Sequence, residues 1–141
     1  MNGMKTIPPE VAALIPAVQL IITKNNLSAY QDGIERLAAR LQKCSNIGET
    51  DNMKEHPAVF HYFYGSTDLY ICEYDRKRSM YGYAVLGGDL DNSEWGYFDL
   101  LDLISIPQFN IDYHFEKQSI EAALYAKYPK HFKKPKSEEL K

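Results

Sequence analysis

The feature that most constrains the fold is a change of hydrophobic periodicity near residue 47. Before this point apolar residues recur at a spacing close to one helical turn, at Val11, Leu14, Ile15, Val18, Tyr30, Ile34, Leu37 and Leu41. After it, short runs of β-branched and aromatic residues follow one another, separated by turn residues. The first pattern is typical of amphipathic helices and the second of strands. We therefore expect a helical N-terminal part followed by a β-rich part.

Two helices are expected in the N-terminal part. Pro8 and Pro9 suit the first turn of a helix, and Pro16 should kink or end that helix. Ser28 and Gln31 have the spacing of a capping box, which predicts the start of a second helix. We assign residues 1–50 to this N-terminal helical elaboration.

The β-rich part is expected to form an antiparallel meander. Strands are predicted at Ala58–Tyr64, Leu69–Asp75, Ser79–Leu86, Gly96–Phe98 and Ile111–Phe115. The first three are joined by segments short enough for hairpins, which favours antiparallel pairing. The sheet therefore has four or five strands in this prediction.

Two later helices complete the predicted fold. Asp99 and Ser119 are placed to cap them, and Pro129 should end the second one. We predict an α+β fold, an antiparallel β-meander with helices packed on one face. Residues 56–128 form its core domain, residues 129–141 form a disordered basic tail, and the chain is a single domain overall.

Charge is unevenly distributed along the 141 residues, whose formal net charge is −3. Residues 56–116 contain three basic and ten acidic side chains, a net charge of −7. Residues 127–141 contain six Lys and two Glu, a net charge of +4. Because an acidic region repels phosphate backbones, a protein partner is favoured over a nucleic acid, although the basic tail could contact one.

Several classes of protein are excluded by what the sequence lacks. The two cysteines, Cys44 and Cys72, have no metal-ligand spacing, so we expect a reduced pair in a cytoplasmic protein. The longest apolar run, Val11–Ile22, is shorter than the roughly 20 residues that a membrane helix needs. The loop with Asp89 and Asp91 departs from the EF-hand spacing, and the sequence contains no cofactor fingerprint. We therefore expect no membrane segment, no metal and no cofactor.

Five motifs follow one another in the second half of the chain, namely Phe60–Tyr64, Leu69–Glu73, Tyr81-Gly82, Glu94–Leu103 and Asp112–Phe115. In this order they resemble the family catalogued as domain of unknown function 2958, over about residues 57–124. The family is bacterial and phage-borne and is frequent on plasmids and conjugative elements. It usually has Trp ahead of the aromatic in the second motif, where this chain has Leu69-Tyr70. The resemblance implies a fold and a mobile-element context but no chemistry.

Three carboxylates on the motif positions are candidates for chemistry, Glu73, Glu94 and Asp112. An enzyme would use Glu73 and Asp112 as acid and base, helped by His61 or His114. If the strand face that carries Glu73 is buried, this carboxylate needs an altered pKa or a fixed partner. The alternative is that each acid braces a turn or a strand end.

Aromatic residues are the best candidates for a binding surface, because tyrosine joins an apolar ring to a polar tip. The candidate binding residues are Tyr62, Tyr70, Tyr74, Tyr81, Trp95 and Glu94. An open tyrosine face combined with the basic tail would suit single-stranded nucleic acid. The alternative is that helices cover both faces of the sheet.

These observations leave three functional hypotheses. The first is a non-enzymatic binding or adaptor protein of a mobile genetic element, which acts through protein–protein contacts. The second is an enzyme or small-ligand binder that uses Glu73 and Asp112 with a histidine. The third is a single-stranded nucleic-acid binder that uses tyrosines and the basic tail. The partner and the oligomeric state stay open at this level.

Overall fold

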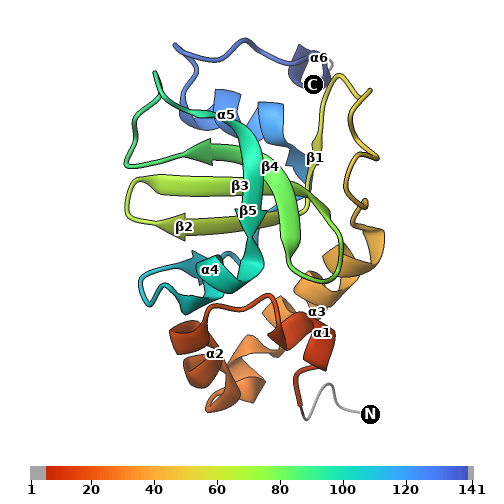
Figure 1. The fold of residues 1–141 in the computed structure, drawn as a ribbon, viewed down its shortest axis with the longest axis vertical. Coiled ribbons are helices and arrows are strands. Elements are labelled where there is room, and N and C mark those ends of the chain that lie inside the picture. Colours follow the sequence, from red (N-terminus) through yellow and green to blue (C-terminus); the bar gives the residue numbers. More distant parts are fainter. Residues whose placement is uncertain (1–5, 140–141) are drawn as a thin grey trace.

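A five-stranded antiparallel sheet lies at the centre of the computed structural model, which describes residues 6–139 (Figure 1). Its strand order is β5-β4-β3-β2-β6. The strands are β2 (Phe60–Tyr64), β3 (Thr67–Tyr74), β4 (Ser79–Val85), β5 (Glu94–Asp99) and β6 (Asn110–Ile111). A second sheet pairs β1 (Pro57–Ala58) with β7 (Gln118–Ser119). The predicted α+β class with an antiparallel meander is confirmed.

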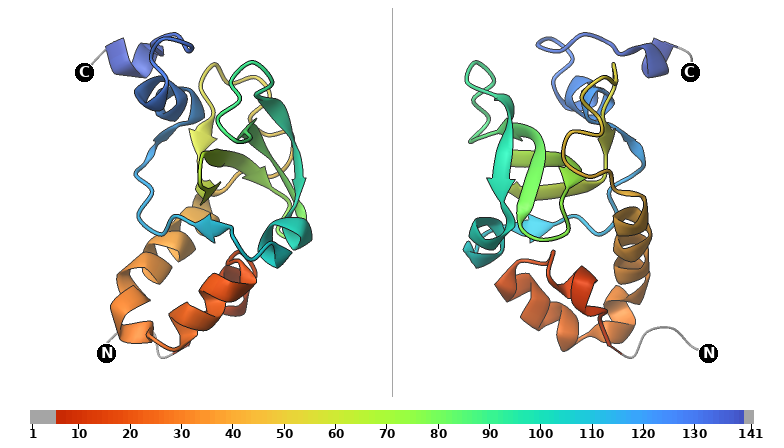
Figure 2. Two further views of the ribbon diagram at one scale, coloured as in Figure 1. Left: turned by 90° about the vertical axis from the view of Figure 1, so that its left-hand side faces the viewer. Right: turned by 45° about the vertical axis from the view of Figure 1, so that its right-hand side comes forward.

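Helices lie on both faces of the sheet. The helices are α1 (Pro9–Ala12), α2 (Ala17–Lys24), α3 (Leu27–Lys43), α4 (Leu100–Ser105), α5 (Ile120–Lys127) and α6 (Lys136–Glu139). Residues of α1, α3 and α4 share one apolar core with Phe60, Tyr62 and Ile71. Helix α5 packs on the opposite face against Tyr70 and Cys72 (Figure 2). The sequence predicted helices packed on one face of the sheet, and α5 covers the other face as well. Every residue of β3 after its first is therefore buried, as is usual for a strand that is covered on both sides.

The N-terminal helices belong to the same core as the sheet. The Tyr62 hydroxyl donates to the carbonyl of Leu14 at 2.6 Å, and Thr23 and Tyr113 hydroxyls are bonded at 2.7 Å. The Gln19 side chain bonds both the N–H and the C=O of Ile111, at 2.7 and 2.9 Å. Gln19 thereby satisfies the outer backbone groups of the edge strand β6. Residues 6–50, which were predicted to form an N-terminal helical elaboration, therefore share one hydrophobic core with the sheet.

Most of the helix boundaries that local signals predict agree with the structure, and one does not. Helix α1 ends at Ala12 and α2 begins after Pro16, so this region contains two short helices in place of the single one expected. Helix α3 begins at Leu27, and no side chain caps it, so the predicted Ser28 cap is wrong. Asp99 and Ser119 do cap α4 and α5, accepting from the N–H groups two and three residues ahead.

The C-terminal segment is folded back onto the domain as far as the structure describes it. Phe132 meets the Tyr83 ring edge-on at 5.8 Å between centroids. Ser137 in α6 bonds the Glu55 carboxylate through both its N–H and its hydroxyl, at 3.1 and 2.6 Å. The predicted disordered tail at 129–141 is therefore wrong for residues 129–137, while residues 140–141 lie outside the described part.

Candidate functional site

Glu73 is a buried structural acid. It is 1% exposed, and its carboxylate accepts from the N–H groups of Gly48 and Thr50, at 2.8 and 3.0 Å, and from the Thr50 hydroxyl. Burial alone would raise the pKa of Glu73, but these three donors together hold it below its ordinary value. All three donors belong to Gly48 and Thr50, in the loop that follows α3. Glu73 therefore fixes that loop on the sheet, as the structural alternative expected.

Asp112 lies in a different cluster, which is built around His61. The two ring nitrogens of His61 lie 2.7 Å from an Asp68 oxygen and 3.5 Å from an Asp112 oxygen. Lys127 of α5 pairs with the other Asp68 oxygen, and the Tyr70 ring stacks on His61 at 4.8 Å. Burial would raise the pKa of Asp68, but the bonds from His61 and Lys127 outweigh it and lower that pKa.

The structure does not bring Glu73 and Asp112 together. Glu73 lies three residues beyond Tyr70 on β3, about 10 Å along the strand. Asp112 follows β6, which lies two strands from β3, about 10 Å across the sheet. His114 is exposed and contacts Asp32 at 3.9 Å. The acid–base pair that the enzyme hypothesis needs is absent from the described residues.

The two cysteines are free and buried. Burial raises the pKa of the Cys44 thiol to about 11 and that of the Cys72 thiol to about 12. Both thiols are therefore protonated at neutral pH and poor nucleophiles. A group of three or more His, Cys, Asp or Glu side chains fit to hold a metal is not found in residues 6–139.

Most of the tyrosines predicted to bind are inside the protein. Tyr62, Tyr70 and Tyr74 are 0%, 3% and 4% exposed, because helices cover both faces of the sheet. Tyr62 and Tyr70 have raised pKa values through burial, so both rings serve as core residues with protonated hydroxyls. An open tyrosine platform across the whole sheet is therefore wrong, because both faces are covered over β3, although not over the edge strand β5.

Three aromatic residues stay open at one edge of the sheet, and we call them the aromatic ridge: Tyr81, Trp95 and Tyr97. Tyr81 is paired in register with Tyr97, with ring centroids 4.9 Å apart. The Tyr81 and Trp95 rings are stacked at 5.9 Å with planes 14° apart. Tyr97 is 70% exposed, while Tyr81 and Trp95 are half-buried. The ridge is thus a continuous aromatic surface in which the ring of Tyr97 is mostly exposed.

Trp95 and Tyr97 of the ridge lie on β5, which is an edge strand of the sheet, and Tyr81 lies on the neighbouring strand β4 (Figure 1). On its inner side β5 pairs with β4 over six residues, from Glu94 to Asp99. No strand in the described part of the chain pairs with its outer side. Gly96 lies between Trp95 and Tyr97, and a Cβ built there meets nothing within 4 Å. The outer N–H and C=O groups of β5 are therefore available, next to the ridge, for hydrogen bonds with an added strand.

Several carboxylates lie near the ridge. Burial and nearby negative groups, including Glu73 and Asp51, raise the pKa of Tyr81. Glu121 bonds His56 at 2.7 Å, and the His56 ring packs on Trp95 at 4.5 Å. Glu94 is exposed at the start of β5. On the α5 side Lys133 shares a small hollow with Trp95 and Glu121, so one cation also lies nearby.

Sequence reasoning found Tyr81, Trp95 and Glu94 but missed Tyr97 as a binding residue. The signal was present, since residues two apart on a strand share a face and Trp95 and Tyr97 are separated by Gly96. Asp68 and Lys127 were missed for a different reason. They are 59 positions apart, and no local pattern marks such a pair.

No family model matches the chain, and no match was found among curated proteins or solved structures. The resemblance to domain of unknown function 2958 therefore stays a prediction based on motifs. The described residues contain no helix with the length and apolarity needed to cross a membrane.

Proposed function

We propose that this protein is a non-enzymatic binding or adaptor protein that takes an extended, basic segment of a partner protein along β5. The observation that carries the proposal is an unpaired edge strand whose exposed Tyr97 stands in a continuous aromatic ridge. An extended peptide can add to such an edge through main-chain hydrogen bonds. Side chains of the added strand would then lie beside the ridge.

The chemistry of the ridge favours cationic side chains in the partner. Lys and Arg are attracted to the faces of Trp and Tyr rings, worth about 0.5–1 kcal/mol at an exposed site. Asp51, Glu94 and Glu121 add a negative potential around the same rings. An acidic or phosphate-bearing partner would meet this potential with repulsion, so nucleic acid is the weaker candidate for this surface.

The cellular setting belongs to the same proposal. The resemblance to domain of unknown function 2958 would put the chain on a mobile genetic element such as a plasmid or phage, and free cysteines are usual in a cytoplasmic protein. Basic partners in that setting include proteins that handle DNA. Glu73 and Asp112 lie in separate clusters, so they support no second, enzymatic candidate.

Trp95 is the single tryptophan, so its fluorescence reports on the ridge directly. A peptide of alternating Lys and Val should change the Trp95 emission on binding, whereas a matched peptide of alternating Glu and Val should not. Tyr97→Ala should weaken binding of the basic peptide by roughly tenfold, as expected for an exposed aromatic anchor. Tyr64→Ala is the matched control, because Tyr64 is 49% exposed on β2, away from the ridge.

Two results would contradict the proposal. One is equal binding of the acidic and basic peptides, and the other is full affinity in the Tyr97→Ala variant. Oligothymidine provides the nucleic-acid arm of the same assay. Binding of oligothymidine that falls steeply with salt and needs Tyr97 would replace the protein partner by a single-stranded nucleic acid.

A further inference from the structure

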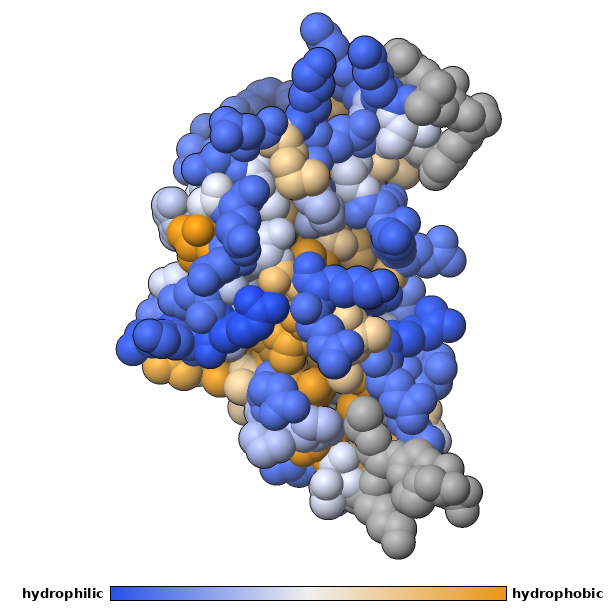
Figure 3. Space-filling model, turned by 90° about the vertical axis from the view of Figure 1, so that its right-hand side faces the viewer, coloured by the Kyte–Doolittle hydropathy of each residue, from blue (hydrophilic) through white to orange (hydrophobic). Residues whose placement is uncertain are grey.

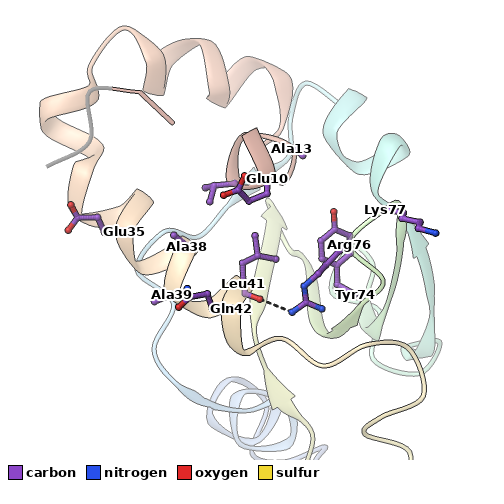
Figure 4. Close-up of a pocket in the computed structure, with 11 residues that line it drawn as sticks. Glu10, Ala13, Glu35, Ala38, Ala39, Leu41, Gln42, Tyr74, Arg76 and Lys77 are labelled. Carbon is purple, nitrogen blue, oxygen red and sulfur yellow. Dashed lines mark hydrogen bonds between the residues drawn. The ribbon is translucent and has the colours of Figure 1, made fainter. Parts of the chain in front are cut away.

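A cavity lies between α1, α3 and the end of β3, on the opposite face of the sheet from Tyr81 and Trp95 of the ridge. It has a volume of about 610 Å³ and is lined by residues of α1, α3 and the β3–β4 connection (Figure 4). Figure 3 shows this side of the molecule, where apolar surface is visible between polar side chains. Pockets that hold small ligands have volumes of about 300–1,000 Å³ and mostly apolar walls. The size is therefore that of a small-molecule site.

The walls of this cavity are mostly aliphatic. Val11, Ala13, Ala38, Ala39 and Leu41 supply apolar surface from two helices. Alanines leave space where longer side chains would fill the gap between α1 and α3. The apolar walls would accommodate the hydrocarbon body of a ligand.

Tyr74 supplies a buried hydrogen-bonding group to the cavity. The residue is 4% exposed and lines the cavity, and its hydroxyl has no hydrogen-bond partner among residues 6–139. Burial raises the pKa of Tyr74, so the hydroxyl stays protonated and can donate. A buried polar group without a partner costs free energy, which a ligand oxygen would recover.

Arg76 supplies a positive charge beside Tyr74, and Figure 4 shows the two side chains next to each other. Its Nη2 donates to the carbonyls of Leu41 and Cys44, at 3.0 and 2.8 Å, which holds the guanidinium at the end of α3. Its Nε and Nη1 have no partner in the described chain, and Arg76 forms no salt bridge there. The φ of Arg76 is 62°, an uncommon backbone conformation for a residue other than glycine. The guanidinium is therefore fixed in place and not neutralised.

The other charged residues at the cavity lie on its rim. Glu35 and Lys77 point away from Tyr74 and Arg76 in Figure 4. Glu10 also lines the cavity and pairs with no cation in the described part. The cavity wall also contains two donors, the buried Tyr74 hydroxyl, which is neutral, and the exposed Arg76 guanidinium, which is cationic.

We propose that this cavity binds a small carboxylate with an apolar body, whose oxygens meet the Tyr74 hydroxyl and the Arg76 guanidinium. Arginine donors match a planar carboxylate in geometry as well as in charge. The prior fixation of Arg76 by α3 lowers the entropy lost on binding. This inference is independent of the β5 surface, and either one can fail alone.

The test uses 3-phenylpropionate as the probe and its neutral amide, 3-phenylpropionamide, as the matched compound. Both are titrated into the full chain labelled with ¹⁵N, and chemical-shift changes are mapped by NMR. The acid should bind with a Kd on the order of 1 mM, as expected for a ligand of this size, and move signals of Ala38, Leu41 and the Arg76 Nε–H. The amide should bind at least fivefold more weakly.

Two variants assign the effect to the proposed donors. Tyr74→Phe keeps the ring and should weaken the acid by about fivefold, the loss of one hydrogen bond. Arg76→Gln should remove the preference for the acid over the amide. Arg36→Gln on the exposed side of α3 is the control and should change neither value. Arg76→Gln also removes the hydrogen bonds to the end of α3 and could loosen this helix. Tyr74→Phe leaves those bonds in place, so its effect on binding tests the cavity separately.

The inference is overturned by any of three results. These are equal affinity for the acid and the amide, unchanged affinity in Tyr74→Phe, and shift changes centred on Arg40 and Lys117, which line other cavities. Absence of binding of the acid up to about 20 mM, well above the Kd expected for such a ligand, would also overturn it.

Discussion

At the scale of single residues, the fold depends most strictly on Gly82, which has no room for a side chain, and on the buried carboxylate of Glu73. Gly82 lies where β4 approaches β3 closely, since a Cβ there would lie 1.8 Å from the Tyr70 carbonyl oxygen. The β3–β4 register also shifts between Ile71 and Glu73. A bulge with a close backbone approach is where a sheet bends sharply. Figure 1 shows β4 and β5 running across the direction of β2 and β3.

Gly82→Ala should therefore strongly destabilise the protein. The added methyl group overlaps a backbone atom that cannot move without moving β3, so we expect a loss of about 3 kcal/mol or more in the free energy of unfolding. Gly96→Ala is the matched control, since Gly96 is the register partner of Gly82 and has open space at its Cβ. Its effect should stay within about 0.5 kcal/mol in the same urea titration. Equal losses for both variants would show that the close approach is not what Gly82 is needed for.

Glu73→Gln should destabilise the protein in a pH-dependent way. At pH 7 the loss should be about 2 kcal/mol, because hydrogen bonds to a buried carboxylate are replaced by bonds to a neutral amide. The folded pKa of Glu73 lies below its ordinary value of 4.5, so its stabilising effect is present above that value. It is lost as the pH falls through the lowered folded pKa.

Urea titrations at several pH values measure this difference. The gap between the natural protein and Glu73→Gln should shrink steadily as the pH falls below about 4.5. Glu116→Gln is the control, because Glu116 is exposed. A gap that stays constant down to pH 2.5 would mean that the shape of the side chain matters and its charge does not.

At the scale of elements, short helices depend on their ends. Helix α5 has eight residues and covers the second face of the sheet, yet an isolated helix of that length is not stable in water. The Ser119 hydroxyl accepts from the Ala122 N–H at 3.0 Å and donates to Glu55 at 2.7 Å. Glu55 also bonds Ser137, so the start of α5, the loop before β1 and α6 meet at one carboxylate.

Ser119→Ala should lower stability by about 1 kcal/mol, the usual effect of losing an N-cap. Thermal unfolding followed by circular dichroism measures the change. Ser105→Ala is the control, because the Ser105 hydroxyl donates to the Asp102 carbonyl inside α4 and is exposed. A shift in the melting temperature for Ser105→Ala as large as that for Ser119→Ala would rule out the cap as the cause.

At the scale of the whole molecule, the N-terminal helices and the sheet share one core. Leu14, Leu37 and Tyr62 are buried together, and hydrogen bonds connect Leu14, just after α1, and Gln19 of α2 with strand residues 48 and 92 positions away. Neither half can bury its apolar face without the other. The chain is therefore expected to unfold as one unit, as is usual for a domain of this size.

Thermal unfolding should show one transition with every probe. Trp95 fluorescence reports on the β5 edge, whereas the far-ultraviolet circular dichroism signal is dominated by the helices, of which α3 is the longest. The two melting curves should coincide. Melting of the helical signal at a lower temperature than the Trp95 signal would instead show that residues 6–50 form a separate unit.

The sequence by itself determined the features that depend on local chemistry. The change of periodicity placed the helices before the sheet, Pro16 divided the first helical segment, and Asp99 and Ser119 marked two helix starts. These signals act between residues at most a few positions apart, so they can be read along the chain. Trp95 and Tyr81 were likewise found as surface candidates from their strand pattern.

The tertiary structure alone decided which face of each element is open. It buried Tyr62, Tyr70 and Tyr74, left Tyr97 at an unpaired edge, and separated Glu73 from Asp112. It also joined Tyr74 and Arg76 to α1 and α3 in one cavity. Burial and pairing of this kind depend on residues many positions away, and their energies are known only when those residues are in contact.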